Sequence, residues 1–218
     1  MKGTNDMAEF RNEFIVAGYV FRKTYSESDG RLYLTIHARV PEMYHKKDEA
    51  TEITQNFPQI VMEGELAREW DEKIKISNDL KDRQYLIVLG HAMTERYMRH
   101  VSGANYRREF RNLYVAEEVI PTRAPANMNY VFFNGEVTHE WHSEDPAKKF
   151  YIISLNVGDG VTISVTYFNR NMDFEPKVGE RISMLGRIQT ERKENASGKG
   201  RSKYTYYNSI VAKAITKL

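Results

Sequence analysis

Cysteine is absent from the sequence. Neither disulfide bonds nor thiolate metal sites can therefore stabilise the fold, which suits a reducing compartment, and we expect a cytoplasmic protein. Long apolar runs are also absent, because the longest, Tyr85 to Gly90 and Phe150 to Leu155, are far short of the roughly 20 residues that span a bilayer. The first residues, MKGTNDMAEF, lack the apolar centre of a secretory signal. We expect no membrane partner and no export.

The excess charge of one sign is small. The formal net charge is +2 over 218 residues, which does not by itself indicate nucleic-acid binding. Aromatic residues are plentiful instead: they make up 12% of the chain and include 14 tyrosines, more rings than a core of this size needs. The positions of the charges and rings must therefore carry any functional argument.

Short apolar or alternating runs predict that the chain is mostly β. These runs are Arg31–Val40, Ile60–Leu66, Tyr85–Gly90, Val161–Tyr167 and Arg181–Ile188. One short helix is predicted over Glu65–Lys75, where Leu66, Trp70 and Ile74 recur at a spacing of four and form one apolar stripe. We expect Trp70 to fill the core beneath this helix.

The two halves of the sequence repeat. A shift of 96 positions brings GHAMTER at 90–96 onto GRIQTER at 186–192, Asn112 onto Asn208, and Val115-Ala116 onto Val211-Ala212. Earlier in each half, Gly18 and Val20 match Gly135 and Val137 at an offset of 117, and Tyr33 matches Tyr151 at 118. The first half is therefore longer, and the additional residues fall largely in the polar stretch from Pro41 to Gln59.

The segment PTRAP at 121–125 separates the halves, since neither of its prolines can donate a hydrogen bond to a sheet. We predict one domain over residues 10–123 and a second over 127–218. Each half then contains five strands and a Gly-containing basic loop between the fourth and fifth strands, which is the size and order of an OB barrel. The predicted fold is all-β with one short helix, arranged as two tandem five-stranded OB barrels.

These segments resemble the bacterial single-stranded-DNA-binding proteins of OB fold. KVGERISMLGRIQTERKENASGKG at 177–200 is similar to the fourth strand and the following loop of that family, and GHAMTERYMRHVSG at 90–103 resembles the same part in the first half. IVMEGELARE at 60–69 resembles the third strand and the start of the helix. The resemblance covers nearly the whole chain, twice, and rests on order and repetition. It implies that the chain binds single-stranded DNA.

Three residues match base-stacking positions of the family. Phe57 lies at the start of the third strand, Phe168 at the end of that strand in the second half, and Tyr97 in the loop after the fourth strand. Tyr167 is a further candidate. The counterparts of Phe168 and Tyr97 in the other half are Glu63 and Lys193, so the resemblance implies that the two halves share the stacking of bases unequally.

Positive charge is concentrated in the two equivalent basic segments, where it could follow the phosphates of a bound strand. From 96 to 111 five arginines accompany one acid, and from 187 to 203 six bases accompany two acids. The candidate phosphate-binding residues are Arg96, Arg99, Arg107, Arg108, Arg187, Arg192, Lys193, Lys199 and Arg201. The alternative is that these are solvated loops whose charges only keep the protein soluble.

Signals of catalysis are weak. His139 and His142 lack an obvious third metal ligand, and SGKG at 197–200 lacks the first glycine of a phosphate-binding loop. We therefore expect no enzymatic activity, no metal and no cofactor.

The sequence thus predicts sequence-tolerant binding and protection of single-stranded DNA during replication, recombination or DNA transfer. Two alternatives stay open: a tandem-OB adaptor that binds only proteins, and an RNA-binding protein that uses the same barrel. The chain ends AKAITKL, without the acidic recruiting tail of chromosomal family members, as in a protein of a phage or mobile element. Family members often place four OB folds around one strand, which suggests a homodimer here by analogy.

Overall fold

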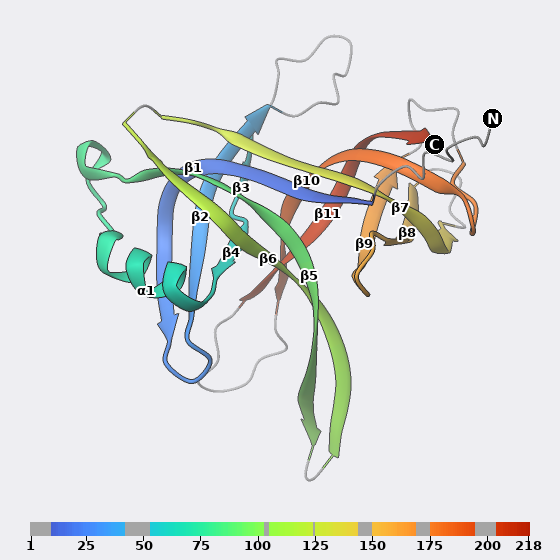
Figure 1. Cartoon of the computed structure of the whole chain (residues 1–218), viewed down its shortest axis with the longest axis horizontal. Helices are drawn as coiled ribbons and strands as arrows, with labels where there is room; N and C mark the ends of the chain where they lie inside the picture. The colour runs from blue at the N-terminus through green and yellow to red at the C-terminus, as the bar shows by residue number, and fades with distance from the viewer. Residues whose placement is uncertain are drawn as a thin grey trace, which may run out of the picture.

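The computed structural model describes residues 10–41, 53–102, 105–123, 125–143, 150–168, 175–194 and 204–218. Strands dominate these residues, with one α-helix, as the sequence predicts (Figure 1). The elements in chain order are β1 (Arg11–Ser26), β2 (Arg31–Pro41), β3 (Ile53–Asn56), β4 (Gln59–Met62), α1 (Gly64–Lys73), the 3-10 turn η1 (Leu80–Asp82), β5 (Tyr85–Ser102), β6 (Asn105–Thr122), β7 (Met128–His142), β8 (Phe150–Asn156), β9 (Thr162–Phe168), β10 (Arg181–Glu194) and β11 (Tyr204–Lys217). No helix among them is long and apolar enough to cross a membrane.

Each half closes a barrel from five strands. In the first half β1 pairs with both β2 and β5, and β4 links β2 to β6 through a parallel contact. In the second half β7 pairs with both β8 and β10, and β9 links β8 to β11 in the same way. In each half the first strand, β1 or β7, pairs with both the second and the fourth strand, and the parallel contact closes the ring on the other side. This strand order is that of the predicted OB barrel.

The sequence repeat is also a structural repeat. A bulge lies directly before Gly90 in the pairing of β5 with β6, and another lies directly before Gly186 in the pairing of β10 with β11. A Cβ atom on Gly90 would lie 1.9 Å from the carbonyl oxygen of Val115, so only glycine fits at this crossing. The matching of Tyr33 with Tyr151 is wrong, however. Tyr33 lies opposite Thr24, whereas Ile152 occupies the equivalent place opposite Trp141.

An asparagine in the first strand of each half holds the backbone of the fourth strand. Asn129 donates to the carbonyl oxygen of Ile188 (2.7 Å) and accepts from the amide of that residue (2.9 Å). Asn12 makes the same two bonds, of 2.8 and 2.9 Å, to the backbone of Ala92. Asn129 is buried, whereas Asn12 is half-buried. The clamp fixes the position of β5 or β10 against the barrel in each half.

The helix packs as predicted. It begins at Gly64 and ends at Lys73, and its apolar stripe places Trp70 and the following Ile74 in the core. One continuous apolar cluster extends through both halves, from Phe14 and Leu34 in the first to Phe133 and Ile153 in the second.

The two halves meet through their first strands. Antiparallel pairing joins β1 to β7 and places Phe14 opposite Val131, its own equivalent at the offset of 117. The junction therefore has an approximate two-fold symmetry. The division into domains at 10–123 and 127–218 stays a prediction, with β6 ending at Thr122 and β7 beginning at Met128.

A reciprocal exchange of hydrogen bonds also joins the halves. The hydroxyl of Thr190 in β10 accepts from the backbone amide of Phe57 (2.9 Å), and the hydroxyl of Thr94 in β5 accepts from the amide of Thr162 (3.2 Å). Thr94 and Thr190 are equivalent at the offset of 96. The long hairpin of each half is thus attached to the other half at or just before the start of its third strand, β9 or β4.

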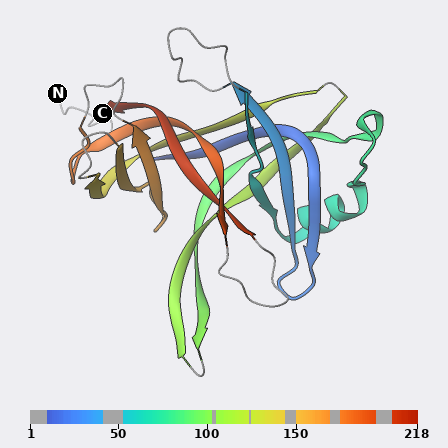
Figure 2. The ribbon, with the colours of Figure 1, turned by 180° about the vertical axis from the view of Figure 1, so that it is seen from behind.

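The basic segments are not loops where the structure describes them. Strands β5 and β6 continue as one ladder to Ser102 and Asn105, so residues 96–102 and 105–111 form a β-hairpin arm that projects from the barrel (Figures 1 and 2). Strand β10 likewise continues to Glu194 and pairs there with Tyr204. Where the side chains of the arm are described, both faces carry exposed residues, Arg107 on one and Arg108 on the other.

Candidate functional site

The outer face of the first barrel carries polar and aromatic side chains. Strand β2 alternates, with Leu32, Leu34 and Ile36 fully buried in the core. Because successive side chains of a strand point to opposite faces, Tyr33 and Thr35 between them lie on the outer face. The strands on either side of β2, β1 and β4, add further side chains to this outer face.

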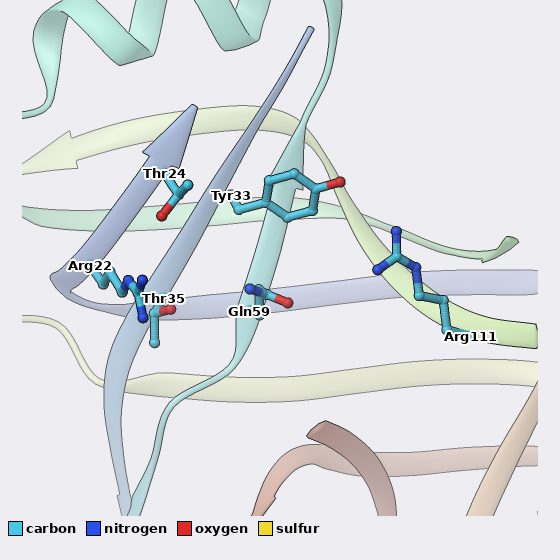
Figure 3. Close-up of a pocket in the computed structure, with 6 residues that line it drawn as sticks. All are labelled: Arg22, Thr24, Tyr33, Thr35, Gln59 and Arg111. Atoms are coloured by element: carbon cyan, nitrogen blue, oxygen red, sulfur yellow. The ribbon is translucent and has the colours of Figure 1, made fainter. Parts of the chain in front are cut away.

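A groove crosses this outer face. Four strands, β1, β2, β4 and β6, contribute to it, and its volume is about 280 Å³. Figure 3 shows Arg22 at one end of the lining residues and Arg111 at the other. The lining residues are Arg22, Thr24, Tyr33, Thr35, Gln59 and Arg111. The groove therefore combines two guanidinium groups with one aromatic ring and several hydrogen-bonding groups.

A smaller hollow of about 90 Å³ continues the groove toward the second half. It shares Thr35 and Gln59 with the first hollow and adds Phe57. Across from them the second half contributes Thr190, Tyr207 and Asn208, and the amide of Asn208 donates to the carbonyl oxygen of Gln59 (3.3 Å). The path thus passes from the first barrel onto the β10–β11 hairpin.

A group of rings borders the smaller hollow. The ring of Phe57 lies 5.3 Å from that of Phe21 and 4.8 Å from the imidazole of His37, and the imidazole lies 4.7 Å from Tyr19. Phe21 is 52% exposed although it is a large apolar side chain. Arg83 covers the far end of the group, with its guanidinium carbon 4.1 Å from the centre of the Tyr19 ring. An exposed phenylalanine at the head of such a group offers a flat apolar surface to a ligand.

A network of charges holds Arg111 at the rim of the groove. Arg111 binds Glu95 through its Nε (2.7 Å), and Arg31 of β2 binds the other oxygen of the same carboxylate. Arg31 also pairs with Glu63 (2.7 Å) beside the start of the helix. Burial would raise the pKa of Glu95, but the hydrogen bonds and positive charges of Arg31 and Arg111 outweigh it and lower the pKa. Glu95 is therefore a stable anion that fixes Arg111 to the base of the arm.

The arm presents two different faces. On one face the hydroxyl of Tyr97 donates to Glu109 (2.8 Å), and the guanidinium carbon of Arg111 lies 5.4 Å from the centre of the Tyr97 ring. On the other face the guanidinium carbon of Arg96 lies 5.5 Å from the centre of the Phe110 ring. Register and alternation place the exposed Arg107 with Tyr97, and the exposed Arg108 with Arg96. Only the face with Tyr97 continues toward the groove.

The outer face of the second barrel has rings but lacks the two equivalent arginines. Trp141, 48% exposed, lies 5.6 Å from the ring of Phe150, which lies 6.0 Å from that of Phe168. At the positions equivalent to Arg22 and Arg111 stand His139 and Tyr207. The two halves therefore differ in chemistry on equivalent faces.

Several predicted site residues lie away from the groove. Phe57 lines the smaller hollow that continues the groove, whereas Tyr97 lies along the arm and Phe168 lies on the second barrel. Tyr167 as a stacking residue is wrong, because this side chain is fully buried and its ring cannot meet a base. Arg187 is half-buried and donates to Gln189 (3.1 Å) on its own strand.

The remaining predicted residues are described in part or not at all. Three of them have a described backbone only: Arg99 in β5, and Arg192 and Lys193 in β10. Lys199 and Arg201 lie outside the described residues. These assignments stay predictions.

The sequence interpretation missed most of the groove. Arg22, Thr24, Tyr33, Thr35 and Gln59 were not among the predicted site residues, and Arg111 entered only as part of a charge cluster. The alternation of β2 contains the signal for Tyr33 and Thr35, because each lies between two buried aliphatic residues of a strand and therefore faces outward. The contributions of β1 and β4 depend on strand pairing and have no local signal.

The structure is similar to two solved structures of the single-stranded DNA binding protein from Thermus aquaticus. The wild-type protein matches with a TM-score of 0.69 and 13% identity, over 97% of this chain and 94% of that one. A variant with a deletion and a substitution matches with a TM-score of 0.69 and 15% identity, over 97% and 96% of the two chains. At these identities the likeness shows the fold. No protein-family model and no curated protein matches the sequence.

Proposed function

We propose that the chain binds single-stranded DNA along the groove of the first barrel and the adjoining face of the arm, without catalysing a reaction. The observation that carries this proposal is the groove itself, in which Arg22 and Arg111 flank the ring of Tyr33. Single strands are held by cations that follow the phosphates and by rings on which bases stack. The fold shared with the protein from Thermus aquaticus supports the same function.

In this mechanism phosphates contact Arg22 and Arg111, while unpaired bases stack on Tyr33 and Phe57. Each stacked base contributes about 1–3 kcal/mol, and every base has a ring face, so binding tolerates any sequence. A duplex binds poorly because its bases are stacked on one another. The exposed Arg107 on the same face of the arm extends the positive path.

We place the activity in the protection of single-stranded DNA during replication, recombination or DNA transfer, with a homodimer in the cytoplasm as the functional unit. The same groove could accept RNA, which has the same phosphates and bases. The 2′-hydroxyl distinguishes the two, so a comparison of DNA and RNA oligomers of equal sequence decides between them.

The test is a fluorescence-anisotropy titration of labelled oligo-dT of about 35 nucleotides, longer than the ~4–16 that one OB fold covers. A duplex of equal length and an RNA of equal length are titrated alongside. We expect strong preference for the single strand and weaker binding as salt rises. Failure to bind the single strand at low salt would refute the proposal and favour a protein-interaction adaptor.

Two variants assign the binding to the groove. Tyr33→Leu removes a ring from its lining, and Tyr130→Leu removes a half-buried tyrosine of β7 that lies outside it. We expect Tyr33→Leu to weaken binding by about 5-fold to 100-fold, the range for one lost stacking contact, and Tyr130→Leu to leave it unchanged. Equal losses for the two variants would mean that the strand takes another path.

A further inference from the structure

A second and larger hollow lies between α1 and the end of β6, away from the proposed DNA groove. Its volume is about 700 Å³. Apolar groups from both elements line it: Leu66 and Trp70 from the helix, and Val119 and Pro121 from the strand. Leu66 and Val119 are only partly buried, so the hollow offers apolar surface to a partner.

The rim of this hollow is acidic. Glu69, Glu117 and Glu118 line it, together with one base, Lys73. Lys73 is already bound by Glu69 one turn away on the same helix, and Glu117 binds the imidazole of His91 (2.7 Å). The carboxylates therefore outnumber the cations. Such a rim repels phosphates and favours a basic, partly apolar protein segment.

The face of the arm that carries Arg96 and Phe110, opposite the face with Tyr97, is basic and apolar and so complements the acidic hollow. Met98 and Phe110 are 58% and 61% exposed, which is unusual for large apolar side chains at a projecting position. The exposed Arg96 and Arg108 stand beside them. Apolar area at the centre with arginine around it is the composition of a protein-binding surface.

A single molecule cannot bring these two surfaces together. Phe110 and Val119 lie on the same strand, β6, and their separation of nine positions corresponds to about 30 Å of extended chain. The arm and the helix occupy opposite ends of the β5–β6 hairpin (Figure 1). The contact must therefore form between copies.

We infer that the arm of one copy docks, through Arg96, Met98, Arg108 and Phe110, into the acidic hollow beside α1 of a second copy. The two surfaces are different, so the contact either is exchanged reciprocally between the two copies of a closed dimer or continues head-to-tail to a third copy. Copies joined in this way cover a ligand side by side. The inference does not depend on the proposed DNA binding, because it concerns the protein alone.

Sedimentation velocity without nucleic acid tests the contact by charge reversal. The wild type should show a sedimentation coefficient that rises with concentration. Arg96→Glu with Arg108→Glu should abolish the rise, and so should Glu117→Lys with Glu118→Lys. An equimolar mixture of the two double variants should restore it, because each supplies one reversed surface to the other.

A control variant carries the same change in net charge on exposed lysines elsewhere, Lys177→Glu with Lys213→Glu, and should associate as the wild type does. Circular dichroism melting verifies that every variant is folded. A wild type that stays monomeric, or a closed dimer that the charge variants do not alter, overturns the inference. A loss of DNA affinity in the arm variant without a change in association would assign that face to nucleic acid instead, and also overturns it.

Cross-linking gives a second readout, made simple by the absence of cysteine from the chain. Phe110→Cys places one thiol on the arm, and Pro121→Cys places one in the lining of the hollow. Under mild oxidation the mixture of both variants should form a disulfide-linked pair faster than either variant alone. A mixture of Phe110→Cys with Lys213→Cys is the control, and an equal rate of linking there would refute the docking site.

Discussion

The double substitution Arg22→Ala with Arg111→Ala gives the most direct test of the groove. Both side chains line the groove, and they come from strands β1 and β6, which are far apart in the sequence. A local distortion of either strand would therefore not displace both side chains. The fold should tolerate the change. Glu95 loses Arg111 but keeps its bond to Arg31, so its carboxylate is not left without a cation.

The expected effect follows from counterion release. Each phosphate neutralised on a single strand contributes about −0.7 to the slope of log affinity against log salt, so two lost contacts reduce the slope by about 1.4. Between 50 and 200 mM salt, a fourfold change, the wild type should therefore lose about sevenfold more affinity than the variant does. The affinities should differ most at low salt.

The assay is the oligo-dT anisotropy titration at four or more salt concentrations. Lys177→Ala with Lys213→Ala removes the same charge outside the groove and should keep the wild-type slope. An unchanged slope in Arg22→Ala with Arg111→Ala would show that phosphates do not follow the groove. Equal slope changes in both variants would show that only the overall charge matters.

Three further predictions concern the framework that supports the groove. Asn129→Ala should lower the free energy of unfolding by about 2–4 kcal/mol, because it leaves a buried backbone amide and a buried carbonyl unpaired. Asn12→Ala should lower it less, because Asn12 is only half-buried and water can replace the lost bonds. Urea unfolding of both variants measures the difference, and an equal or larger loss for Asn12→Ala would contradict this reasoning. Gly90→Ala should prevent folding, since its Cβ would overlap the carbonyl oxygen of Val115. A Cβ on Gly160 would meet no atom within 4 Å, so Gly160→Ala should lower the free energy of unfolding by only about 1–2 kcal/mol, because of the positive φ at that position. A soluble, native-like Gly90→Ala protein would refute the close approach of the two strands. Because the pKa of Glu95 is lowered in the fold, its ion pairs stabilise the protein above the ordinary glutamate pKa and lose this effect as the pH falls through the lowered value. Glu95→Gln should therefore melt lower than the wild type at neutral pH and approach it in acid, and a constant gap across pH would argue against the network.

Repetition made the fold predictable. Because GHAMTER and GRIQTER recur at one offset, any strand and bulge assigned in one half applies to the other, and Gly90 and Gly186 do occupy equivalent bulges. The helix was predictable from its own apolar stripe, which needs no knowledge of the rest of the chain. Local periodicity and internal repetition are both readable without tertiary contacts.

The errors arose where tertiary contacts decide. Residues 96–111 look like a basic loop because charges follow one another, yet cross-strand pairs such as Arg96 with Phe110 extend the ladder. Tyr167 looked available because a strand of unknown register can turn either face inward, and the actual register buries it. The groove joins Arg22, Gln59 and Arg111 from three distant strands, a meeting that only the closed barrel produces.

The approximate two-fold symmetry of the β1–β7 junction has a consequence for a bound polymer. Two identical halves related by such an axis would treat a strand running in either direction alike, because the rotation that exchanges the halves also reverses the strand. Here Arg22 corresponds to His139, and Arg111 corresponds to Tyr207, so the exchange does not reproduce the surface. The two faces together therefore have a polarity: under the proposed function, a single strand that passes from the basic face to the aromatic face would have a defined 5′ and 3′ sense.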